Sequence, residues 1–190
     1  MYEGLDTIVL FEELAYEDLV PLAWHASNTP ITDLARRSFV ERNVKLLQAC
    51  TALEEHGQPE KLDERTPYHA DIVRLDMKVN LLLDLVGQIL TASHPRPEAV
   101  PVRFNALGAA WQHKGAMPVA NTPGVLELYL RECVVEPLRL SGQIASVGAD
   151  GRVKVKFDNC GETVADLIEK LAFRRHRRQV AGARSTQRDA

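Results

Sequence analysis

Four arginines near the C-terminal end are the residues in this sequence best suited to binding chemistry. Arg174, Arg175, Arg177 and Arg178 fall within five consecutive positions. Guanidinium forks bind phosphate oxygens through paired hydrogen bonds, so the group predicts contact with an anion. The alternative is a solvated helix end, where cations complement the negative end of the helix dipole and pair with an acidic segment. No aromatic residues are interleaved with the arginines, so we expect no nucleic-acid surface.

Motifs for nucleotide, hydrolase or metal chemistry do not occur in the sequence. We find no G-x-x-x-x-G-K-[ST], G-x-G-x-x-G, G-x-S-x-G or H-E-x-x-H pattern. The histidines lack ligand spacing, and His69 is expected in solvent. Cys50, Cys133 and Cys160 are too widely spaced for a CxxC metal pair or a disulfide framework, and Cys133 is expected in a strand of the core. We therefore expect no enzymatic activity, no metal and no cofactor.

Composition predicts a globular protein with no general attraction for nucleic acid. The 190 residues are 45% hydrophobic and carry a formal net charge of −3. No apolar stretch is long enough to span a membrane, and no basic segment of a secretion signal opens the chain, so a cytoplasmic location is expected. Residues 1–64 have a net charge of −8 and residues 171–190 a net charge of +5. These two regions could attract each other, within one chain or between chains.

A heptad repeat predicts a long helix at residues 65–95. Apolar residues alternate in spacing between four and three, at Tyr68, Ile72, Leu75, Val79, Leu82, Val86 and Ile89. A period of 3.5 makes helices wind around one another, so we expect this helix to assemble copies of the chain. Thr66 and Pro67 are expected to start the helix, and His94 and Pro95 to end it. The alternative is an amphipathic helix that covers a single core.

The apolar surface of this helix is wider than a two-stranded coil needs. Leu83 and Leu90 occupy e positions and Leu85 a g position, where charges are usual. This width favours a tetramer over a dimer, or allows the chain's own domain to pack there. Gly87 costs about 1 kcal/mol relative to alanine inside a helix, and we interpret it as a site of close helix approach.

The region before this helix is interpreted as a helical extension, residues 1–64. It holds a predicted helix at residues 32–55, a candidate short strand at residues 7–11, and a linker at residues 57–65.

The region after Pro95 changes to a period of two, which is typical of strands. Short antiparallel strands are predicted near residues 100–104, 109–113, 126–130, 138–144 and 152–157. Asp150 and Gly151 predict a hairpin turn, and Val153, Val155 and Phe157 are expected to face the core. A final helix begins near Glu162. We expect residues 96–180 to form a barrel with this helix, and residues 181–190 a disordered tail.

The C-terminal half resembles a PilZ domain. The resemblance covers residues 98–180 and rests on PVRFNALGAAW, EPLRLSGQIASVGADGRVKVKFDN and ETVADLIEKLAFRRHRR. The preceding RLDMKVNLLLDLVGQIL is similar to atypical PilZ proteins in which a long heptad helix assembles a tetramer. The resemblance implies an α+β fold with a six-stranded antiparallel barrel and a C-terminal helix. It also implies a role in bacterial cyclic di-GMP signalling.

The two signatures of PilZ domains that bind cyclic di-GMP are incomplete in this sequence. RxxxR is missing before the first barrel strand, where Arg96 is the only arginine. Of [DN]x[SA]xxG only Gly108 remains, because Arg103 replaces the acid or amide and Asn105 the small residue. The resemblance thus implies an adaptor that acts on an unknown signalling protein and does not bind the messenger in the usual way. The alternative is a receptor with a non-standard site, for which the candidates are Arg96, Arg103, Asn105, Gly108, Arg174, Arg175 and Arg178.

Overall fold

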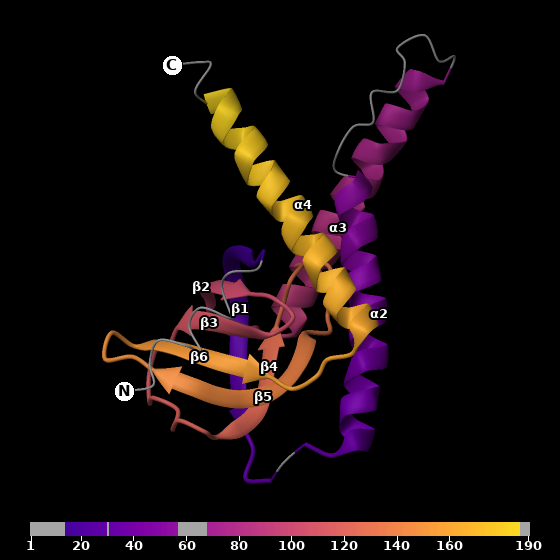
Figure 1. The fold of residues 1–190 in the computed structure, drawn as a ribbon. Coiled ribbons are helices and arrows are strands. Elements are labelled where there is room, and N and C mark those ends of the chain that lie inside the picture. The colour runs from indigo at the N-terminus through magenta and orange to yellow at the C-terminus, as the bar shows by residue number, and fades with distance from the viewer. Residues whose placement is uncertain (1–13, 30, 57–67, 187–190) are drawn as a thin grey trace.

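The fold is a closed antiparallel barrel accompanied by long helices (Figure 1). The computed structural model describes residues 14–29, 31–56 and 68–186, except for the side chains of residues 54–56 and 178–186. The helices are α2 (Asp33–His56), α3 (His69–Ser93) and α4 (Glu162–Thr186). The strands are β1 (Tyr16–Ala26), β2 (Ala99–Phe104), β3 (Gly108–Gln112), β4 (Pro123–Leu128), β5 (Leu138–Val147) and β6 (Arg152–Phe157).

The barrel closes in the order β1-β2-β3-β6-β5-β4. The period-two pattern predicted β2 to β6, and β6 has the predicted faces, because Val153, Val155 and Phe157 are buried. Their outward neighbours on this strand are cationic. Gly151 completes the predicted hairpin turn with φ at 81°, a backbone conformation that favours glycine.

The sixth strand, β1, comes from the region interpreted as a helical extension, and that interpretation is wrong for residues 16–26. β1 pairs with β2 through Tyr16 opposite Phe104 and with β4 through Leu22 opposite Leu128. The sequence hides its alternation because Leu19 points outward, 61% exposed, beside the buried Val20. The candidate strand at residues 7–11 lies outside the described residues.

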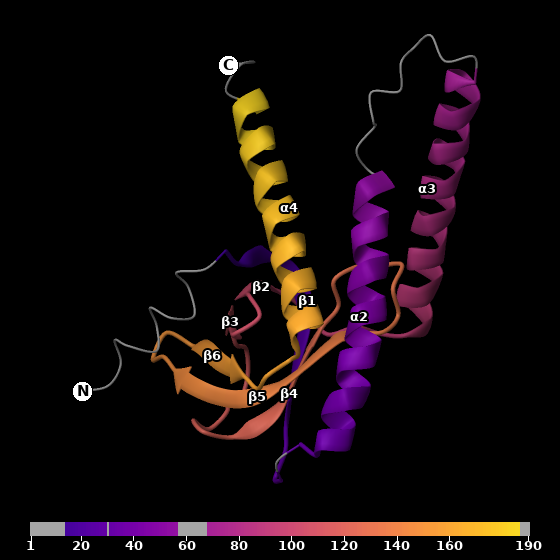
Figure 2. The same cartoon turned by 45° about the vertical axis from the view of Figure 1, so that its right-hand side comes forward.

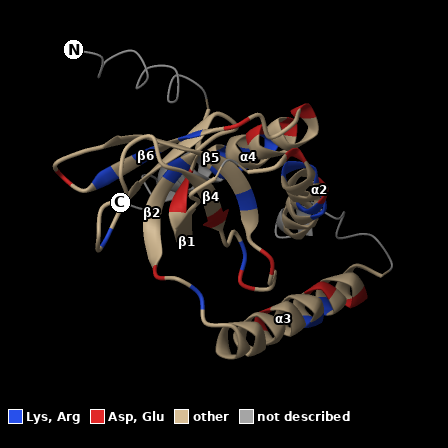
Figure 3. Cartoon of the chain, turned by 90° about the horizontal axis from the view of Figure 1, so that it is seen from below, with Lys and Arg blue, Asp and Glu red and all other residues tan. Residues whose placement is uncertain are grey.

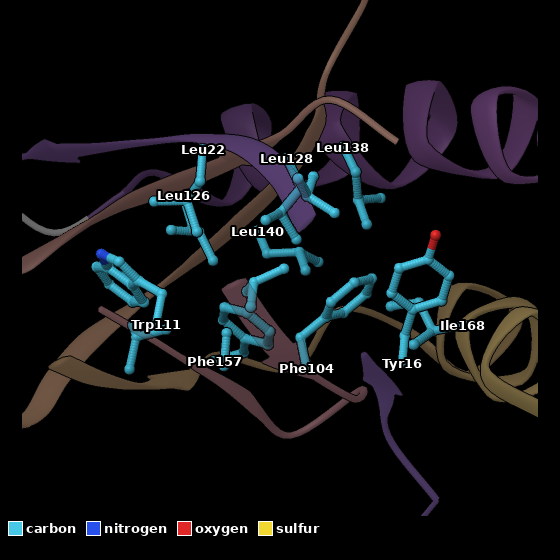
Figure 4. Packing of buried hydrophobic residues seen from close by; sticks show 14 of the residues in the cluster. Tyr16, Leu22, Phe104, Trp111, Leu126, Leu128, Leu138, Leu140, Phe157 and Ile168 are labelled. Atoms are coloured by element: carbon cyan, nitrogen blue, oxygen red, sulfur yellow. The ribbon is translucent and has the colours of Figure 1, made fainter. Parts of the chain in front are cut away.

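The barrel core continues beneath α4 and α2. Figure 4 shows side chains from β1 to β6 meeting inside the barrel, with Ile168 of α4 at one end. Tyr16 and Phe104 pack with ring centroids 5.1 Å apart. Two covering helices thus share one core with all six strands.

Helix α2 begins where the sequence predicts. The hydroxyl of Thr32 accepts a hydrogen bond from the Ala35 amide at 3.3 Å, which caps the first turn. The Asn43 side chain donates to the Arg139 carbonyl at 2.7 Å and accepts from its amide at 3.0 Å. Asn43 therefore ties α2 to β5. Leu47 and Cys50 of the same helix are fully buried in the core.

Helix α4 is longer than predicted. It starts at Glu162 as expected but continues to Thr186, so the predicted disorder is wrong for residues 181–186. Residues 187–190 lie outside the described part. The arginines at 174–178 consequently sit in the middle of the helix and not in its last turn. Figures 1 and 2 show the C-terminal half of α4 leading away from the barrel.

Helix α3 is set apart from the barrel (Figure 3). It ends at Ser93, and His94 is extended, as predicted for the residue before a proline. Tyr68 forms the N-cap without a side-chain hydrogen bond, and so lies before the first turn and not inside the helix. Thr66 and Pro67 lie outside the described residues. Within the described ranges, no helix has the length and apolar character to cross a membrane.

Candidate functional site

The predicted heptad residues form an exposed apolar face on α3 and its N-cap. In the single chain the exposed fraction ranges from 41% for Ile72 to 68% for Tyr68. The members of this heptad face are Tyr68, Ile72, Leu75, Val79, Leu82, Val86 and Ile89. Fully burying an exposed Leu, Ile or Val side chain stabilises by about 1.5–3 kcal/mol, and covering these partly exposed side chains supplies a part of that. Monomeric soluble proteins rarely expose so many apolar side chains together.

The rest of α3 is also rich in apolar residues. Val73, Met77 and Leu81 are exposed on the side opposite the heptad face. Leu83 and Leu90, at the e positions, are half-buried. Leu83 lines a hollow together with residues of β1, α2 and the β4–β5 loop, residues 129–137. Leu83 therefore faces the chain's own domain across this hollow.

Gly87 is the one fully buried position among the described residues of α3. A Cβ placed there would lie 3.3 Å from Cβ of Glu132, which belongs to the β4–β5 loop. The close approach is therefore to a loop of the same chain, and the expectation of a neighbouring helix is wrong. Cys133 lies in a turn of this loop and is half-buried, not in a strand as predicted.

Arg96, which follows the end of α3 along the chain, binds the same loop. Its guanidinium donates to the carbonyl oxygens of Arg131 at 3.0 Å, Glu132 at 2.8 Å and Val134 at 2.9 Å. The guanidinium also lies 5.4 Å from the centre of the Tyr129 ring, a cation–π distance. The sole arginine at the RxxxR position is thus occupied by loop carbonyls.

Asn105 lies in the turn between β2 and β3. Arg103 precedes it on β2, and Gly108 begins β3. Asn105 is 1% exposed, and its Oδ1 accepts hydrogen bonds from the amides of Leu107 at 2.9 Å and Gly108 at 3.1 Å. Nε of Arg103 lies 3.0 Å from a carboxylate oxygen of Glu17 on β1. Asn105 therefore shapes the turn, and Arg103 lies on the outer wall of the barrel.

The arginines of α4 contact different parts of the fold. Arg175 forms an ion pair with Asp18 of β1 at 2.7 Å, and Arg174 donates to the Thr51 carbonyl of α2 at 3.3 Å. Arg177 lies 5.8 Å from the ring centre of the exposed Phe173. Arg174 and Arg175 thus fix α4 to its neighbours, and these contacts do not gather the cluster around one site. The side chain of Arg178 is not described.

Glu127 is the centre of a polar network that the sequence does not predict. Its carboxylate lies 2.8 Å from Nε of Arg139, 3.2 Å from Nε2 of His25 and 3.4 Å from the Tyr129 hydroxyl. Burial raises the pKa of Glu127, but Arg139 and then His25 outweigh it and hold this pKa below its usual range. Outward positions on β1, β4 and β5 meet here, and no spacing along the sequence predicts such a meeting.

Tyr16 and Cys160 also have raised pKa values. Burial, followed by the nearby Asp18 charge, raises the pKa of Tyr16, whose hydroxyl donates to Asp18 at 3.2 Å. Burial also raises the pKa of the Cys160 thiol, which disfavours the nucleophilic thiolate. Within the described ranges, no group of three or more histidine, cysteine or acidic side chains could hold a metal ion.

Comparison with known families identifies the class of this fold. A family model described as "Atypical PilZ domain, cyclic di-GMP receptor" matches residues 47–185. The chain belongs to this atypical PilZ family. The matched region includes α3, the barrel from β2 onward, and nearly all of α4.

One similar solved structure is a pathogenic protein from Xanthomonas campestris. It shares 25% sequence identity and a TM-score of 0.69, over 92% of this chain and 94% of that chain. That protein is described as a tetrameric PilZ domain self-assembled via an unusual helical bundle. A comparison with curated protein sequences gave no match.

Proposed function

We propose that this chain is a non-enzymatic PilZ module that self-assembles through α3 and regulates an unidentified signalling protein by direct contact. The exposed heptad face carries the proposal, because a face of this size leaves apolar surface in water until another helix covers it. We place the assembly in the cytoplasm, within cyclic di-GMP-linked regulation, which is the context of the family.

We propose a tetramer as the assembled state. The heptad face alone could serve a dimer, since Val at a and Leu at d favour two strands in parallel coils. Val73, Met77 and Leu81 add exposed apolar surface on another side of α3, which a single partner helix would leave in water. The tetrameric description of the Xanthomonas relative supports the same stoichiometry.

Charge placed in the heptad face tests the assembly. Val79→Glu with Leu82→Glu would bring like charges together in the seam, so the assembly should dissociate to single chains. Both positions are exposed in the single chain, so the fold should survive. The control is Gln143→Glu with Thr163→Glu, which adds the same charge at exposed polar positions outside α3. Light scattering measures the mass, and an unchanged mass in a folded Val79/Leu82 variant would refute the proposal.

We further propose that the module works without binding cyclic di-GMP in the usual way. The Arg96 guanidinium already bonds to loop carbonyls, and Asn105 bonds to backbone amides of its own turn. Three of the five N–H donors of Arg96 and the Oδ1 of Asn105 are thus engaged within the chain, which leaves fewer groups to hold a guanine or a phosphate.

A second candidate function is a cyclic di-GMP receptor with a non-standard site, which the family description favours. Arg174, Arg175 and Arg178 would supply the guanidinium groups. Calorimetric titration of cyclic di-GMP into the full chain separates the two functions. No heat at tens of micromolar protein supports the messenger-independent module. Saturable binding by the full chain would establish the receptor, and its loss in a folded Arg175→Ala variant would locate the site on α4.

A further inference from the structure

The β4–β5 loop lies between α2 and α3 and is flanked by hollows (Figure 2). On its α2 side, two hollows of about 460 and 570 Å³ share Arg42, Val135 and Glu136, so they form one groove. Each hollow has a volume typical of ligand sites. We name this surface the loop groove; its lining residues used here are Arg42, Lys45, Leu46, Arg96, Val135 and Glu136.

The loop groove carries an excess of positive charge. Arg42 and Lys45 are exposed one turn apart on α2, and neither side chain forms an ion pair or a hydrogen bond within the described part of the chain. Arg96 keeps its charge, because its partners are neutral carbonyl oxygens and an aromatic ring. Arg139 also lines the groove, but a carboxylate of β4 balances it. Among the described residues, Glu136 is the one carboxylate that lines the groove, so the complementary ligand is acidic.

Apolar side chains line the groove beside these cations. Val135 is 43% exposed, and Leu46 and Val134 line the same hollow. A small inorganic anion would pair with the cations and leave this apolar surface in water. A peptide that carries both acidic and apolar side chains would cover both kinds of surface.

The loop is held in place before any ligand arrives. The Arg96 guanidinium binds three of its carbonyl oxygens, and the loop lies close against Gly87 of α3. A surface that is already ordered loses little conformational entropy on binding. The loop groove is therefore suited to a protein segment that binds through a few side chains.

We propose that the loop groove binds an acidic segment of a partner protein. Carboxylates of the segment pair with Arg42 and Lys45, and an apolar side chain packs against Val135 and Leu46. This inference rests on the proposed function, because it names the surface through which the module contacts its signalling protein. None of the heptad-face residues lines the groove, so partner binding and assembly through α3 use different surfaces.

Fluorescence anisotropy of a labelled peptide tests the groove in the full-length protein. The probe is a fluorescein-labelled octapeptide of glutamate and leucine, and the control peptide has glutamine in place of glutamate. The acidic peptide should bind saturably, with its affinity reduced in high salt, and the glutamine peptide should bind about tenfold more weakly. Absence of saturable binding at about 1 mM acidic peptide, or equal binding of the two peptides, would overturn the proposal.

Charge reversal on α2 locates the contact. Arg42→Glu with Lys45→Glu should weaken binding of the acidic peptide by about tenfold or more. The matched control is Lys156→Glu with Lys170→Glu, which makes the same change in net charge at exposed positions outside the groove and should change binding by less than about twofold. Equal weakening in the two folded variants would show attraction to the whole protein and would overturn the proposal.

Two further measurements exclude other occupants. A peptide of glutamate and glycine should bind about fivefold more weakly than the glutamate–leucine peptide, and equal binding would mean a site for anions alone. Light scattering should give the same mass for wild type and for Arg42→Glu with Lys45→Glu. A smaller mass in this variant would make the groove a contact between copies of the chain and would overturn the proposal. Peptide binding by a wild type that stays a single chain would refute assembly through α3 and leave the groove intact.

Discussion

Arg96 shows that a candidate binding residue can be a structural one. The sequence marks it as the last trace of a messenger signature, yet its guanidinium binds three carbonyl oxygens of the β4–β5 loop. These partners lie 35 to 38 residues away along the chain, so no local pattern could predict them. The same loop contacts Gly87, so Arg96 fixes the surface on which α3 rests.

Replacing Arg96 should therefore cost stability. Arg96→Ala leaves three carbonyls without their charged donor, and we expect the free energy of unfolding to fall by about 1.5–3 kcal/mol. Arg96→Lys should lose most of the same amount, because one ammonium group cannot reproduce the planar fork. Denaturant titration measures both variants, with Arg74→Ala as the exposed control. A loss below about 0.5 kcal/mol in Arg96→Ala would contradict the structural role.

Glu127 should make stability depend on pH. Its pKa is lowered in the folded protein, so its contribution is present above the unfolded pKa of about 4.3 and is lost as the pH falls through the folded pKa. Glu127→Gln should lower the free energy of unfolding at pH 7 by about 1–3 kcal/mol. The difference from wild type should shrink as the solution becomes more acidic than pH 4. A constant difference from pH 7 to pH 3 would contradict this account, and Glu169→Gln serves as the exposed control.

At the scale of elements, periodicity predicted the helices and strands whose apolar residues are regularly spaced. It missed β1, whose apolar residues are not. Strict alternation located β6 and the other barrel strands after Pro95, and 3.6-residue spacing located α2 and the start of α4. β1 was missed because Leu19, Val20, Pro21 and Leu22 run together without alternation, although only Val20 and Leu22 are buried. Its place in the sheet depends on partners about 80 to 100 residues away, which a local pattern does not contain.

The inward face of β6 carries its own prediction. Phe157 is 8% exposed and belongs to the barrel core, so Phe157→Ala should lower the free energy of unfolding by about 3–5 kcal/mol. Lys156→Ala, on the outward face of the same strand, should change it by less than about 0.5 kcal/mol. Denaturant titration compares them, and similar losses in the two variants would refute the assignment of faces.

At the scale of the whole molecule, the N-terminal strand and the barrel form one unit. β1 closes the barrel between β2 and β4, so a truncation that removes residues 16–26 opens the sheet. The sequence could predict the class of fold and an exposed heptad face, because both depend on repeating patterns. It could not predict the carbonyl partners of Arg96, which lie on a loop far away along the chain.

The central claim is that α3 assembles the protein, and the mass of the wild-type chain in solution tests it most directly. Light scattering across a hundredfold range of concentration should give about four times the chain mass of 21.2 kDa. A mass of 21.2 kDa at every concentration would contradict assembly. Twice that mass would contradict the tetramer but would be consistent with a dimer that pairs through the heptad face.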